Sequence, residues 1–99
     1  MNEDFEVIMY KTKNGVEPLN KFLNSLDSKM YAKFLMEYDL LKEYGNALPM
    51  PYSKPLEKGI FELRIQVSNN ISRVLYFFMS GKKIVLTHGF IKKNTEDTI

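Results

Sequence analysis

The stretch GIFELRIQVSNNISRVLYFF, residues 59–78, decides the fold. Its first half, residues 60–67, alternates apolar and polar side chains, which is the pattern of a β-strand with one buried face. Its second half, residues 71–78, is apolar on both faces, as expected of a central strand. The Ser68-Asn69 pair between the halves predicts a two-residue turn, so the stretch should form an antiparallel β-hairpin.

Elements on either side of this hairpin complete an α+β pattern. Residues 5–10 and 84–92 read as further strands. Pro18 starts a short helix, and Asp27 or Ser28 caps a longer one that stops at Gly45. Residues 46–59 hold three prolines and are expected to form an ordered crossover loop. We therefore predict an α+β arrangement: an N-terminal strand, a helical hairpin, and a three-strand antiparallel meander that completes a four-stranded sheet.

Strand register predicts which side chains share a face of this sheet. A two-residue turn at Ser68-Asn69 places Arg64 directly opposite Arg73. A Ser80-Gly81 loop, or a four-residue loop between Phe78 and Lys83, places Arg73 opposite His88. The other face should pack on the helices and form the core; it carries Phe61, Leu63, Ile65, Val74, Tyr76 and Val85. Four apolar side chains then share the face of Arg73: Leu75, Phe77, Ile84 and Leu86.

The row Arg64, Arg73 and His88 suits a phosphate undergoing transfer. Like charges directly opposite each other destabilise a sheet by up to ~1 kcal/mol, so the row needs a reason. Arginine donors fit phosphate oxygens, and histidine carries a proton near neutral pH. Gly89 beside His88 is expected to leave room for RNA. The structural alternative is that Glu62 bridges the two arginines and that His88 is packed beside Phe90.

Length and composition exclude several classes of protein. Ninety-nine residues predict a single domain, residues 1–99. No cysteine is present, so disulfides and thiolate metal sites are impossible, and we expect neither metal nor cofactor. No long apolar run predicts a membrane span, and the N-terminus does not resemble a signal peptide, so a cytoplasmic protein is expected. Between Lys54 and Lys93, eight basic residues stand against two acidic ones, which indicates a surface for phosphates.

The second half of the chain resembles a known family. The quoted motifs are Ser53-Lys54-Pro55-Leu56, Gly59 to Arg64, Arg73 to Phe78, and Val85 to Lys93. Together and in this order they are similar to the HigB branch of the RelE/ParE toxin superfamily, including its phage-derived relatives. Family members commonly continue into a C-terminal helix beyond the Lys92-Lys93 pair, whereas this sequence ends at Ile99.

The resemblance implies a type II toxin that acts as a ribosome-dependent messenger RNA endoribonuclease without a metal. It implies a helix-turn-helix, HigA-like antitoxin as partner, a heterotetrameric complex, and contact with operator DNA only through the antitoxin. By motif position it implies catalytic roles for Arg64, Arg73, His88 and Lys93, and RNA binding by Lys54, Lys58 and Lys92. Two alternatives remain open: a ParE-like topoisomerase-targeting toxin, and a noncatalytic binding module of the same fold.

Overall fold

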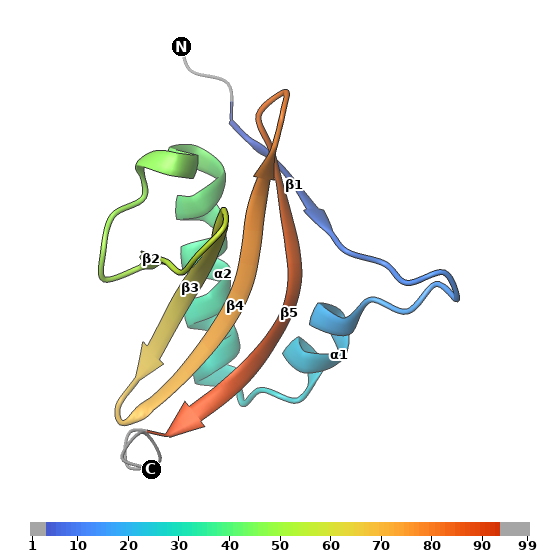
Figure 1. Cartoon of the computed structure of the whole chain (residues 1–99). Helices are drawn as coiled ribbons and strands as arrows, with labels where there is room; N and C mark the ends of the chain where they lie inside the picture. The colour runs from blue at the N-terminus through green and yellow to red at the C-terminus, as the bar shows by residue number, and fades with distance from the viewer. Residues whose placement is uncertain (1–3, 94–99) are drawn as a thin grey trace.

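The computed structural model describes residues 4–93 and shows two helices on a five-stranded mixed sheet (Figure 1). The strand order across the sheet is β1-β5-β4-β3-β2. In chain order the elements are β1 (Glu6–Met9), α1 (Pro18–Asn24), α2 (Ser28–Tyr44), a 3-10 turn (Gly45–Ala47), β2 (Ser53–Pro55), β3 (Ile60–Val67), β4 (Asn70–Met79) and β5 (Lys83–Lys93).

The helix boundaries follow from local chemistry, as the sequence predicts. Pro18 occupies the first turn of α1, where its missing N–H costs nothing. The carboxylate of Asp27 accepts a hydrogen bond from the Met30 N–H at 2.8 Å and caps α2. Gly45 ends α2 with φ +53, and a side chain there would collide with the ring of Phe5. A glycine is therefore required at this position by both backbone and packing.

The prediction of four strands is wrong, because the proline-rich crossover contributes a fifth. Ser53 pairs with Leu63, and the hydroxyls of Ser53 and Tyr76 are hydrogen-bonded at 2.5 Å in the core. Burial raises the pKa of Tyr76, and the hydrogen bond from Ser53 partly opposes that rise. Pro55 fits here because β2 is an edge strand, where a missing N–H leaves no ladder bond unmade. β1 forms the other edge of the sheet and runs parallel to β5.

The core lies between the helices and one face of the sheet. In Figure 1, α2 runs behind the central strands and α1 lies beside β5. The predicted core face is confirmed for Leu63, Ile65, Val74 and Tyr76, none more than 1% exposed. Val85 is also buried, at 7% exposed, but the prediction that it lies on this face is wrong. Its neighbours Ile84 and Leu86 are the core residues, both 0% exposed, whereas Val85 opposes Phe77 on the other face. Among the described residues, no helix is long and apolar enough to cross a membrane.

Candidate functional site

The two arginines of the chain meet on the sheet face that points away from the helices. Arg64 of β3 lies directly opposite Arg73 of β4, as predicted from the turn between them. Their sequence neighbours Leu63 and Val74 are opposite each other in the core. Because side chains alternate along a strand, both arginines belong to the outer face.

Glu62 joins the two arginines into one cluster, as the structural alternative anticipated. Its Oε2 accepts a hydrogen bond from Arg73 Nη1 at 2.6 Å and lies 3.5 Å from Arg64 Nε. Glu62 is buried, and the Arg73 side chain is only 11% exposed, so this pair is shielded from water. The carboxylate therefore offsets the repulsion between the guanidinium groups and holds them in place.

Each arginine has a donor without a hydrogen-bond partner among the described residues. A guanidinium has five N–H donors, and Arg73 gives one of them to Glu62. The Nε atoms of Arg64 and Arg73 are both buried, and neither has a hydrogen-bond partner in the part of the chain that the structure describes. Buried donors without partners are rare in folded proteins, so this cluster is suited to receive an external acceptor.

Of the two lysines predicted to bind RNA from the crossover segment, Lys54 lies on the same face as the arginine cluster and Lys58 lies away from it. Lys54 of β2 lies opposite Glu62, is exposed, and shares the outer face with the arginines. Lys58 lies in the turn between β2 and β3, with φ +54, and is also exposed. The four residue steps from Ile60 to Arg64 span about 13 Å, so Lys58 lies well away from the arginines.

The predicted pairing of Arg73 with His88 is wrong. The loop between β4 and β5 has three residues, so Met79 opposes Lys83 instead of Lys82. Gly81 and Lys82 adopt positive φ values of +80 and +58 in this loop. This shift alone would turn every β5 side chain to the other face.

A bulge in β5 restores the face of His88 but not its position. Between the pairs Val74–Gly89 and Tyr76–Leu86, both Thr87 and His88 stand against the single residue Leu75. Arg73 is consequently opposite Phe90. His88 lies on the same outer face, two residues and about 7 Å further along the strand. The imidazole is exposed.

Gly89 serves packing and does not open a path for RNA, contrary to our expectation. A Cβ at this position would lie 2.6 Å from the ring of Phe22 in α1 and 3.1 Å from the Arg73 carbonyl oxygen. The glycine therefore faces the helix layer. The Thr87 hydroxyl donates a hydrogen bond to the Leu75 carbonyl at 3.1 Å, which stabilises the adjacent bulge.

Lys92 and Lys93 complete β5. Their backbones pair with Ile71 and Asn70 of β4. Their side chains lie outside the part of the chain that the structure describes. The catalytic role expected of Lys93 and the RNA-binding role expected of Lys92 stay predictions.

Sequence reasoning missed a buried carboxylate that lines the same cavity as Arg64. Glu37 of α2 is 1% exposed, and burial raises its pKa from 4.5 to about 7, although Lys33 opposes that rise. Its spacing carried the signal: positions 30, 34, 37 and 41 form one line along a helix, and Met30, Phe34 and Leu41 are buried. A polar residue on this line points at the core, whereas the apolar residues Tyr31 and Leu35 lie off the line and are exposed.

Glu37 lines a cavity of about 300 Å³ that Arg64 also lines. The remaining walls come from Lys33, Pro51, Tyr52, Gln66 and Ile71. Within residues 4–93, no group of three or more histidine or carboxylate side chains is placed to hold a metal ion.

The fold and the site together define a small α+β protein with a basic, arginine-bearing sheet face. The family "phage derived protein Gp49-like (DUF891)" matches residues 21–98, and the chain belongs to this family. The family lies in the RelE/HigB-type toxin superfamily, which indicates a toxin module of a toxin–antitoxin system with a cognate antitoxin as partner. No curated protein matches the chain.

Proposed function

We propose that this protein is a HigB-like toxin that cleaves messenger RNA on the ribosome and is neutralised by a helix-turn-helix, HigA-like antitoxin. The observation that carries the proposal is the pair Arg64 and Arg73 on the outer sheet face, with Nε atoms that have no hydrogen-bond partner among the described residues. Family membership adds the toxin class. The cytoplasm is the compartment where this substrate is found.

The reaction is attack of a ribose 2′-hydroxyl on the adjacent phosphate. The bond from phosphorus to the 2′ oxygen forms and the bond to the 5′ oxygen breaks, which leaves a cyclic 2′,3′-phosphate and a 5′-hydroxyl. Arg64 and Arg73 donate to the non-bridging oxygens as negative charge develops on them. Glu62 keeps both guanidinium groups in position through its contacts of 2.6 and 3.5 Å.

Two protons must move in this reaction. The 2′-hydroxyl loses one, and the departing 5′ oxygen gains one. His88 is the candidate for one of these transfers, because it shares the arginine face and histidine titrates near neutral pH. Lys93 is the second candidate. Lys54, Lys58 and Lys92 would bind neighbouring backbone phosphates, so that the RNA runs across the outer face of β2 to β5.

Partner binding follows from the same proposal. The antitoxin covers the toxin in a heterotetramer, and operator DNA is contacted only through the antitoxin. Growth arrest then requires free toxin.

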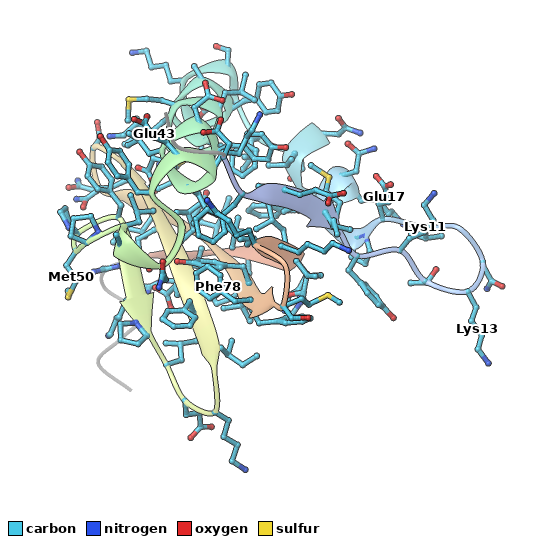
Figure 2. The ribbon with its side chains drawn as sticks, turned by 90° about the horizontal axis from the view of Figure 1, so that it is seen from above. Lys11, Lys13, Glu17, Glu43, Met50 and Phe78 are labelled. Atoms are coloured by element: carbon cyan, nitrogen blue, oxygen red, sulfur yellow. The ribbon has the colours of Figure 1, made fainter. Side chains whose placement is uncertain are left out.

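The test is induction of the protein in cells, followed by mapping of messenger 5′ ends. We expect new 5′-hydroxyl ends inside coding regions, growth arrest, and loss of both with Arg73→Ala. Lys13→Ala is the control for loss of one positive charge, because Lys13 lies on the loop between β1 and α1 that projects from the molecule (Figure 2). Growth arrest with intact messengers would overturn the nuclease and favour a ParE-like topoisomerase target. Neither arrest nor cleavage would favour a noncatalytic binding module.

A further inference from the structure

The cavity beside Arg64 wraps around the edge of β3 where β2 has ended. β2 pairs only with Phe61 to Leu63 of β3. The next residue, Arg64, donates its backbone N–H to the Tyr52 carbonyl at 2.8 Å, which fixes the loop wall. On the other side, Lys33 Nζ donates to the Gln66 carbonyl at 3.4 Å and ties α2 to the edge of β3. These contacts hold the walls of a cavity of about 300 Å³.

Two polar groups of this cavity have unused hydrogen-bonding capacity. Glu37 Oε1 is buried and has no hydrogen-bond partner among residues 4–93. Arg64 Nε also has no hydrogen-bond partner there, although it lies 3.5 Å from Glu62 Oε2 in an ion pair. A buried polar atom without a partner costs roughly 1–3 kcal/mol, and more when it is charged. Apolar side chains at position 37 would avoid this cost, since Met30, Phe34 and Leu41 on the same line of α2 are buried without it. The carboxylate is therefore suited to an external donor.

Size and polarity select the ligand. Pockets for drug-sized ligands begin near ~300 Å³, so the cavity suits a single ring system better than a longer ligand. Above its pKa of about 7, the Glu37 carboxylate is ionised and only accepts hydrogen bonds. Lysine and arginine only donate them. Guanine presents two adjacent N–H donors, N1 and N2, beside the acceptor O6. It matches Glu37 with its donors and the cations Lys33 and Arg64 with its acceptor, while Tyr52 and Ile71 provide apolar contact.

We propose that the cavity lined by Glu37, Tyr52 and Arg64, here called the Glu37 pocket, binds a guanine base of the RNA whose adjoining phosphate is held by Arg64 and Arg73. Arg64 is common to the pocket and to the arginine cluster, so the base and the phosphate of one nucleotide are read side by side. Glu37 is then the residue that determines base preference at the cut. This inference rests on the proposed nuclease function.

The first test is binding, because it does not require cleavage. The wild-type protein is titrated by NMR with the 5′-monophosphates of guanosine, adenosine, cytidine and uridine. We expect guanosine monophosphate to bind ~10-fold or more tightly than the others, in line with the discrimination of a good bidentate base contact. Shifts should centre on Tyr52, Gln66 and Ile71. Equal affinity for all four nucleotides, or shifts confined to other residues, would overturn the pocket.

Two variants test whether the Glu37 carboxylate itself determines the preference for guanine. Glu37→Gln puts an N–H₂ donor opposite the donors of guanine and should remove the preference, with affinity for the guanine nucleotide falling ~10-fold or more. Asp39→Asn makes the same charge change on an exposed position of α2 and should leave the preference unchanged. If Glu37→Gln fails to fold, the comparison of the four nucleotides on wild-type protein decides alone.

Mapped cleavage ends provide the second readout. Cuts by the wild type should be enriched next to guanine, and this enrichment should vanish in Glu37→Gln. Selective guanine binding without any cleavage would support the pocket and refute the nuclease. Cleavage with no base preference, together with unselective binding, would refute the pocket and leave the nuclease standing.

Discussion

Replacing Glu37 by glutamine should change the pH dependence of stability. Burial raises the pKa of Glu37 from 4.5 to about 7 in the folded protein, so the folded state keeps a proton that the unfolded chain releases. Its contribution to stability is therefore fully present below pH 4.5 and is lost as the pH rises to about 7. The shift corresponds to about 3 kcal/mol at roughly 1.4 kcal/mol per pKa unit. This is a large share of the ~5–15 kcal/mol that stabilises a typical domain.

Urea unfolding at a series of pH values between 4 and 8 measures this effect directly, as a difference between variant and wild type. The free energy of unfolding of Glu37→Gln relative to wild type should rise by about 3 kcal/mol from the acidic to the basic end of the series. Asp39→Asn, which changes an exposed carboxylate of the same helix, should show no such rise. A difference for Glu37→Gln that is constant with pH would refute the reasoning that this carboxylate is buried without compensation.

Four further substitutions test the remaining parts of the structure. Arg73→Ala should abolish growth arrest while circular dichroism stays native, and a folded variant that is still toxic would remove Arg73 from the site. Leu63→Ala should lower the free energy of unfolding by ~2–5 kcal/mol, because the side chain is 0% exposed; a loss well below that in urea unfolding would place the core elsewhere. His88→Gln should slow single-turnover cleavage by ~10²-fold if the imidazole transfers a proton, whereas a rate within a few-fold of wild type assigns it a structural role. Gly89→Ala should lower the melting temperature, since its Cβ would meet the Phe22 ring at 2.6 Å; an unchanged melting temperature would show that α1 moves easily.

The first hairpin was predictable from the sequence because one feature fixes it. A two-residue turn at Ser68-Asn69 sets every pairing from Val67–Asn70 to Ile60–Phe77, and the structure has these pairs. The opposition of Arg64 and Arg73 follows from that turn alone.

The second hairpin was not predictable, because two local irregularities add up. Gly81 and Lys82 both adopt positive φ, which makes a three-residue loop where the sequence also permits two or four. The bulge at Thr87 and His88 then adds a second shift of one residue. Since side-chain orientation repeats every two residues, the two shifts return His88 to the predicted face but displace it along the strand.

The edge strand β2 and the buried carboxylate of Glu37 were not predicted for a different reason. Each depends on a tertiary contact. Three residues that end in Pro55 carry no strand pattern, and β2 is fixed by its pairing with β3 and by the hydrogen bond between Ser53 and Tyr76. Glu37 was not among the residues predicted to be buried, although its spacing from Phe34 and Leu41 places it on the buried line of α2. For a charged residue on such a line, spacing was the better guide than polarity.

Strand alternation assigns neighbouring residues of this protein to separate tasks. Leu63 and Arg64 are adjacent in sequence, yet Leu63 packs against the helices and Arg64 contacts Glu62 on the opposite face. Val74 and Arg73 repeat the arrangement on β4. Because only the backbone connects the two faces, substitutions in the core should act on stability and substitutions of the arginines on RNA chemistry. Arg64 is the exception, because it belongs to both the arginine face and the pocket beside the helix layer. It lines the Glu37 pocket around the edge of β3, so the proposed base pocket joins the helix layer to the arginine face.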